Sequence, residues 1–114
     1  MKACVVLISS ITSSSEQEHN TRALNALLDA KKIDRKYVDG AVEENWPLRN
    51  ELFELSGVRG KYPQVFLQAD GQYEFLGMYP KLHELNEMSD IPVHLRERNN
   101  IQTLDSILQD VKKQ

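Results

Sequence analysis

The chain of 114 residues contains a single cysteine, Cys4, and this scarcity limits its chemistry. One thiol cannot form a disulfide within the chain, and Cys4 with three scattered histidines cannot supply the usual four-ligand zinc site. Because 40% of the residues are hydrophobic, the chain can build an ordinary core that depends on neither a disulfide nor a metal. The length predicts a single domain over residues 1–114.

Clusters of positive charge and long apolar runs are also lacking. The chain has 14 basic and 17 acidic residues, a formal net charge of −3, and its basic residues are dispersed along the sequence. Nucleic-acid binding relies on clustered Lys and Arg, so this composition argues against a nucleic-acid partner. The early apolar run CVVLIS is too short for a signal-peptide core or a membrane span. We therefore expect a cytoplasmic monomer without membrane insertion.

The apolar pattern in the first part of the chain predicts strands that alternate with helices. CVVLIS at 4–9 is β-branched and almost continuously apolar, which is typical of a strand covered on both faces. A helix should begin near Ser15, which has capping-box spacing to a glutamate; Ser13 is an alternative register. RKYVDG at 35–40 predicts a short strand that stops at a turn pair.

The second half of the chain continues the alternation. EENWPLRNELFELSG predicts a helix whose inner side carries Leu48, Leu52, Phe53 and Leu55. QVFLQ and QYEFLG flank Asp70-Gly71, a signal for a type I′ hairpin between two strands. A third helix should cover 79–88, and after a break at 89–92 a last helix carries Ile101, Leu104, Ile107, Leu108 and Val111.

The predicted order is β-α-β-α-β-β-α plus a terminal helix. Right-handed crossovers make the first two strands parallel, and the final hairpin adds antiparallel neighbours. An α/β fold with a four-stranded mixed sheet and helices on both faces is the natural solution. This is the thioredoxin arrangement in its small, glutaredoxin-like form.

The dipeptide Tyr62-Pro63 stands directly before the predicted strand QVFLQ. Proline removes a ladder donor, so it is tolerated only at the first residue of a strand, at an edge or at a bulge. A cis Tyr62-Pro63 bond would turn the Tyr62 backbone outward and offer its N–H and C=O to an extended peptide. Thioredoxin-fold proteins use their loop proline in this way; an ordinary trans proline at a strand start is the alternative.

Gly77 and Met78 are expected close to the same place, where the fourth strand ends. In glutaredoxins the equivalent turn uses backbone amides at a helix start to meet the terminal carboxylate of glutathione. Pro80 has no N–H, and this stretch lacks the small hydroxyl or acidic residue usual in glutaredoxins. Glutathione is therefore an alternative ligand, and otherwise no cofactor is expected. Gly77 as a simple turn residue is the other interpretation.

The most informative absence is a thiol at the start of the first helix. A thiol oxidoreductase of this fold keeps Cys-x-x-Cys, or its first Cys, there, because the helix N-terminus lowers the thiol pKa. The matching stretch 11–15 reads ITSSS, and it includes Thr12 and Ser13 but no sulfur. Cys4 should lie at the opposite end of its strand, about 20 Å away, buried and inert. We therefore expect a redox-inactive protein that is not an enzyme.

Four segments together resemble a known family: ISSITSSSE, VDGAVEEN, YPQVFLQADGQYEFLGMY and RERNNIQTLDSIL. In this order and spacing the chain resembles the SH3-domain-binding glutamic-acid-rich-like proteins, which are redox-dead relatives of glutaredoxin. The resemblance implies a thioredoxin fold without Cys-x-x-Cys. The chain departs from the family in three ways: it has no P-x-x-P motif and no glutamate-rich tail, and residues 81–93 are extra sequence.

The sequence thus predicts an interaction or adaptor module. Its binding groove is expected to lie between Thr12 and Ser13, Tyr62 and Pro63, and Gly77 and Met78, with a protein partner bound as an extended peptide. No metal-binding residues are predicted. A glutathione-binding or glutathione-dependent redox protein is the alternative.

Overall fold

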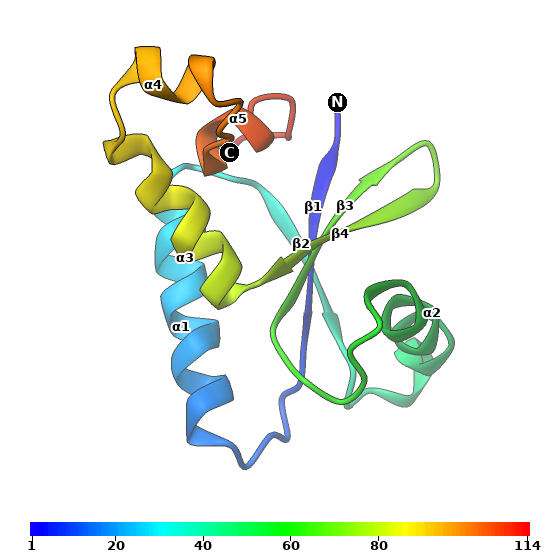
Figure 1. Cartoon of the computed structure of the whole chain (residues 1–114). Coiled ribbons are helices and arrows are strands. Elements are labelled where there is room, and N and C mark those ends of the chain that lie inside the picture. Colours follow the sequence, from blue (N-terminus) through cyan, green and yellow to red (C-terminus); the bar gives the residue numbers. More distant parts are fainter.

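A four-stranded mixed sheet organises the chain. The computed structural model describes all residues, 1–114. Its strands are β1 (Ala3–Ile8), β2 (Arg35–Asp39), β3 (Gln64–Ala69) and β4 (Gln72–Met78). The sheet order is β2-β1-β3-β4, with β1 parallel to β2 and antiparallel to β3, and β3 antiparallel to β4 (Figure 1). The predicted α/β class and mixed sheet are confirmed.

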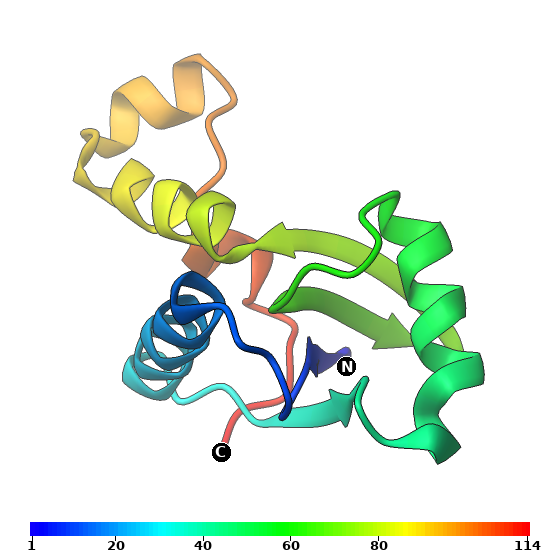
Figure 2. The same cartoon turned by 90° about the horizontal axis from the view of Figure 1, so that it is seen from below.

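Helices cover both faces of the sheet, as predicted. They are α1 (Ser15–Ala30), α2 (Trp46–Ser56), α3 (Tyr79–Glu87), α4 (Val93–Arg98) and α5 (Leu104–Ile107), with short 3₁₀ turns η1 (Glu43–Asn45) and η2 (Met88–Asp90). Figure 2 shows α1 and α3 on one face of the sheet and α2 on the other. None of these helices has the length and apolar character needed to cross a bilayer.

The alternation of side chains along β1 explains its nearly continuous apolar sequence. Cys4 and Val6 belong to the larger core cluster, on the α1 and α3 side, whereas Val5 and Leu7 pack in the smaller cluster under α2. All four side chains are buried. A central strand with helices on both faces has no side that can carry polar residues.

The start of α1 differs in detail from the prediction. The helix begins at Ser15 as expected, but the N-cap is Ser14, whose Oγ accepts a hydrogen bond from the Gln17 N–H at 3.2 Å. The predicted capping residues, Ser15 and Ser13, do not fill this role. In a run of three serines the spacing to the glutamates could not identify the capping residue.

The C-terminal region also departs from the prediction. In place of one long helix, the structure has α4 and α5, with Asn100 between them at a φ of +53°. Asparagine tolerates this left-handed conformation better than most residues, so the chain can turn there. Thr103 and Ser106 then form a capping box that starts α5. Val111 lies beyond α5 and forms a parallel bridge with Lys2.

The hairpin has the predicted turn, whereas α2 differs from its prediction at one residue. Asp70 and Gly71 both have positive φ, 54° and 76°, which is the conformation that a type I′ turn requires. In α2, Leu52 and Phe53 are buried as predicted. Leu55, however, is 48% exposed, so its assignment to the inner side was wrong. It lies two residues beyond Phe53, about 200° around a helix, and this turns it away from the sheet.

Candidate functional site: the Pro63 corner

Three chain segments meet at the end of the sheet where β1 finishes. They are the loop 9–14, the dipeptide Tyr62-Pro63, and the junction Gly77-Met78, and together we call them the Pro63 corner (Figure 2). The strand register explains their proximity, because Gln64 at the start of β3 pairs with Leu7 of β1 on one side and with Met78 of β4 on the other. The structure thus brings the predicted segments to one end of the sheet.

The Tyr62-Pro63 bond is cis, which agrees with the first of the two interpretations of the sequence and not with the trans alternative. Pro63 is buried, and Tyr62 is half-buried. Neither the N–H nor the C=O of Tyr62 makes a hydrogen bond within the protein. Such backbone groups normally find a partner in protein or water. The Tyr62 backbone is therefore available to a partner.

The side chain of Tyr62 points toward α2. Its ring packs on Phe53 with a centroid distance of 5.9 Å, and its hydroxyl lies beside Gly40 in the loop after β2. Burial raises the pKa of Tyr62; the positive charge of Arg49 opposes this rise, and the negative charge of Asp39 adds to it. The side chain thus anchors the residue, while its backbone groups have no partner within the chain.

Gln64 holds the loop that leads to Tyr62. Its side chain is fully buried, and its Nε2 donates hydrogen bonds to the carbonyl oxygens of Val58 at 2.7 Å and Lys61 at 2.8 Å. The Oε1 atom is buried without a hydrogen-bond partner. Sequence reasoning missed this residue. A polar residue at the first, buried position of an apolar strand was the signal that could have identified it.

Thr12 and Ser13 have different roles in the loop 9–14. The Thr12 hydroxyl donates to Gln17 Oε1 at 2.9 Å and accepts from the Ser14 N–H at 3.2 Å, so it organises the loop itself. Ser13 is exposed. The neighbouring Ile11, which the sequence did not single out, has 77% of its surface exposed. Ile11 therefore offers a partner an exposed apolar side chain in the loop 9–14.

Gly77 and Met78 link β4 to α3. Gly77 has a φ of +151°, and a Cβ atom there would stand 2.9 Å from Cδ of Lys81. Met78 is half-buried, and its extended backbone caps α3 without any side-chain hydrogen bond to the helix amides. Pro80 lies in the first turn and contributes no N–H. Gly77 is thus a conformational requirement as well as a member of the corner.

Arg49 adds an unpaired positive charge close to Tyr62, and no sequence pattern pointed to it. Its guanidinium lies 5.2 Å from the ring centroid of Trp46 and 5.8 Å from that of Phe53. Nη1 donates to the Gly40 carbonyl oxygen at 3.2 Å, but no carboxylate lies within ion-pair distance. A half-buried guanidinium without a counter-ion favours the approach of an anionic group.

Asp39 ties the loop 9–14 to the end of β2. Its Oδ1 accepts hydrogen bonds from the N–H groups of Ser10 at 3.1 Å and Ala41 at 3.0 Å. Desolvation raises the pKa of Asp39, but these hydrogen bonds outweigh it and hold the pKa below its usual value. The carboxylate therefore fixes the positions of two loops at the Pro63 corner.

Cys4 lies at the far end of β1 and takes no part in the corner. It pairs with Leu67 of β3 and Arg35 of β2, and its surface is fully buried. Burial raises the pKa of this thiol to about 11, although the charge of Arg35 slightly opposes the shift. The prediction of a buried cysteine is confirmed. The structure contains no group of three or more His, Cys, Asp or Glu residues arranged to hold a metal ion.

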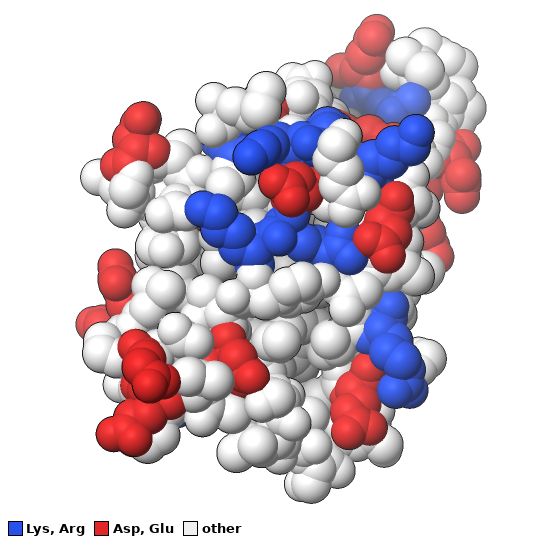
Figure 3. All heavy atoms as spheres, turned by 180° about the vertical axis from the view of Figure 1, so that it is seen from behind, with Lys and Arg blue, Asp and Glu red and all other residues white.

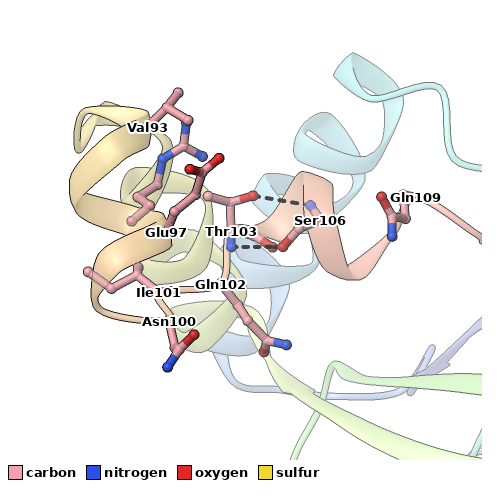
Figure 4. Close-up of a pocket in the computed structure, with 9 residues that line it drawn as sticks. Val93, Glu97, Asn100, Ile101, Gln102, Thr103, Ser106 and Gln109 are labelled. Carbon is pink, nitrogen blue, oxygen red and sulfur yellow. Dashed lines mark hydrogen bonds between the residues drawn. The ribbon is translucent and has the colours of Figure 1, made fainter.

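The main surface hollows lie away from the Pro63 corner, and none is lined by its six predicted residues. One hollow of about 500 Å³ lies between α4 and α5 (Figure 4). Its lining is mostly polar, and the hydroxyls of Thr103 and Ser106 are already used in the capping box of α5. The corner is therefore an open surface that suits an extended chain better than an enclosed small molecule.

No protein-family model matches the chain, and no curated protein matches it in sequence. The geometry of the Pro63 corner is therefore the basis for a functional hypothesis. Its relevant features are the free Tyr62 backbone, the exposed Ile11 and the unpaired Arg49.

Proposed function

We propose that the protein is a redox-inactive, thioredoxin-like interaction module that binds an extended segment of a protein partner at the Pro63 corner. The observation that carries this proposal is the backbone of Tyr62, whose N–H and C=O have no partner within the chain. The sheet order and the helices on both faces are compatible with the thioredoxin-like fold. The sequence resemblance to the SH3-domain-binding glutamic-acid-rich-like family supports the same assignment. We further propose that the module acts as a cytoplasmic monomer.

The binding mode follows from the chemistry of a free backbone segment. An extended peptide can pair with Tyr62 through two main-chain hydrogen bonds, as an added strand does. Each such bond contributes only about 1 kcal/mol net, so side-chain contacts must supply most of the affinity. Ile11 in the loop 9–14 offers an apolar contact, and Arg49, which lies near the Tyr62 side chain, favours a carboxylate or another anionic group.

The state of the only thiol supports a role without redox chemistry. Disulfide exchange requires a thiolate that can reach its substrate. Cys4 is buried, and its pKa of about 11 keeps it protonated at neutral pH. A single-turnover assay with a glutathione mixed disulfide tests this point. Reduction that is lost in the Cys4→Ala variant would contradict the proposal.

Partner capture tests the location of the site. We would place a photo-crosslinking amino acid at Ser13, which is exposed in the loop 9–14, and a control one at Ser89, which is exposed in η2. Cross-linking in cell extract should yield specific products from position 13 that position 89 does not give. Ile11→Asp should suppress these products because it replaces the apolar contact with a charge. Identical products from both positions, unaffected by Ile11→Asp, would refute the site.

Glutathione is a second candidate ligand, and one observation favours it. The amides at the start of α3 receive no side-chain cap, and Lys81 lies across Gly77 at the same place. A carboxylate could bind to these amides and the lysine. Titration with reduced glutathione, followed by amide chemical shifts, should then move the signals of Tyr62, Gly77 and Met78. If those signals stay unchanged at about 10 mM, a concentration at which millimolar binding would saturate, glutathione is not a ligand.

A further inference from the structure

Strand β4 has a free edge along its whole length. It pairs with β3 on one side and has no neighbour on the other. In the antiparallel register, Ala69 pairs with Gln72 next to the two-residue turn, and Leu67 pairs with Glu74. Hydrogen-bonded and non-hydrogen-bonded pairs alternate from such a turn, so the N–H and C=O groups of Tyr73 and Phe75 point away from β3. None of these groups has another backbone partner.

The β4 edge has a hollow on each face of the sheet. On the α2 side, a hollow of about 520 Å³ is bordered by Glu51, Leu55 and Tyr73. On the opposite side, a hollow of about 430 Å³ is bordered by Glu74, Leu85 and Ile107. Side chains of an added strand alternate between the two faces. An extended segment that pairs with Tyr73 and Phe75 would therefore place its side chains alternately in the two hollows.

The α2-side hollow combines an unpartnered apolar surface with negative charge. Leu55 is 48% exposed and borders this hollow together with Tyr73, Glu51 and Glu54. Both glutamates are exposed and form no ion pair. On the opposite side of the molecule, seen in Figure 3, Lys and Arg gather over the start of β2 and the C-terminal segment. The negative charge of the two glutamates complements a basic partner.

We propose that the β4 edge is a second docking site, distinct from the Pro63 corner, which binds an extended segment of a basic protein partner. The segment carries an aliphatic residue and a Lys or Arg two positions apart. The aliphatic side chain packs on Leu55 and Tyr73, the basic one meets Glu51 or Glu54, and the main chain pairs with Tyr73 and Phe75. Two separate peptide sites on one small domain would let the protein hold two partners together.

A short synthetic peptide provides the test. The probe is a capped nine-residue peptide in which Thr alternates with Val and Lys, so that Val and Lys share one face of the strand. Binding to the intact protein is followed by amide chemical shifts and by hydrogen exchange. We expect slower exchange at the Tyr73 and Phe75 amides, which are otherwise open to solvent at the sheet edge, and no protection at Tyr62.

Matched variants separate strand pairing from simple charge attraction. Glu51→Lys with Glu54→Lys should weaken binding roughly tenfold, because two attractions become repulsions. Glu16→Lys with Glu18→Lys makes the same change of charge on exposed positions of α1 and should leave affinity within about twofold. A peptide N-methylated on the edge that faces β4 should lose binding, since it cannot donate to the strand.

Three results would overturn the proposal. One is equal affinity of the N-methylated peptide, which would mean that the main chain does not pair. Another is equal weakening by the α1 and α2 charge reversals, which would mean nonspecific attraction. The third is an absence of binding up to about 1 mM, in which case the charge of Glu74 serves only to keep the β4 edge unpaired. The test of the β4 edge does not depend on the Ser13 cross-linking experiment, because the Pro63 corner and the β4 edge share no residue.

Discussion

The hydroxyl of Tyr62 lies so close to Gly40 that a Cβ atom at position 40 would stand 2.8 Å from it. The same Cβ would also stand 3.1 Å from Cδ of Arg49, whose Nη1 donates to the Gly40 carbonyl oxygen. The loop after β2 thus closes directly on the residue that precedes Pro63. A glycine is needed there because any side chain would push Tyr62 away from α2.

We expect Gly40→Ala to destabilise the protein by about 1–2 kcal/mol, since overpacking at a buried site forces its neighbours to move. Urea unfolding measures this change. In the Tyr62→Phe background, where the closest atom is removed, the same Gly40→Ala substitution should cost about half as much. An equal cost in both backgrounds would show that the Tyr62 hydroxyl is not the obstacle. The amide signals of the loop 57–62 should shift in Gly40→Ala alone.

Asp39 should control the order of the loop 9–14. Asp39→Ala removes the acceptor for the N–H groups of Ser10 and Ala41. It should lower the free energy of unfolding by only about 1 kcal/mol, because solvent screens a group that is partly exposed. Asp39→Asn keeps one oxygen acceptor and should cost less. Because the folded pKa of Asp39 is lowered, its contribution exists above the unfolded pKa near 3.8 and disappears as the pH falls through the folded value.

The pH dependence of the Asp39 variants is therefore a sharp test. The stability gap between the wild type and Asp39→Ala should be constant near neutral pH and shrink below about pH 4. Chemical denaturation at several pH values measures the gap. A gap that grows on acidification would contradict the assignment of the ionised carboxylate as the stabilising form.

Much of the fold could be predicted from local patterns, because the strongest signals in this chain are also the strongest physical constraints. The run CVVLIS must be covered on both faces, and Asp70-Gly71 must turn with positive φ. The first requires a strand in the interior of the sheet, and the second joins its last two strands in a hairpin. The approach of Tyr62-Pro63 to the end of β1 followed from this topology.

The errors lie where tertiary contacts decide between local alternatives. The apolar positions from Ile101 to Val111 fit one continuous helix, but the chain turns at Asn100 so that Leu104 and Leu108 can enter the core beside α3. Arg49 and Gln64 could not be predicted because their roles depend on their surroundings in the fold. Arg49 lies against two aromatic rings, and Gln64 donates hydrogen bonds to two loop carbonyls. No one-dimensional pattern encodes such surroundings.

The three consecutive serines before α1 provide a direct test of its cap. Ser14→Ala should cost about 1 kcal/mol, because it removes the acceptor for the Gln17 N–H. Ser13→Ala and Ser15→Ala should change the free energy of unfolding by no more than a few tenths of a kcal/mol. Thermal unfolding of the three variants under identical conditions makes the comparison. If Ser15→Ala were the costly change, the helix would start one residue later than the structure has it.

Cys4 should make the protein less stable at alkaline pH. Its pKa rises from 9.0 to about 11 in the fold, so the neutral thiol is the form that the core accepts. Stability from this group is fully present below pH 9 and is lost as the pH rises toward 11, since the unfolded chain ionises first. The same burial should make Cys4 react slowly with thiol reagents until urea unfolds the chain.

The Cys4→Ala variant isolates this effect from other groups that titrate at high pH. At about pH 8 the variant should be less stable than the wild type by roughly 1 kcal/mol, because it leaves a small cavity in the larger core cluster. Between about pH 8 and about pH 10.5 the gap should close and reverse, with a total change of about 2 kcal/mol, as only the wild type loses stability through its thiol. A gap independent of pH would mean that the Cys4 thiol ionises as easily in the folded protein as in the unfolded chain, and would remove one support for a protein that binds without redox chemistry.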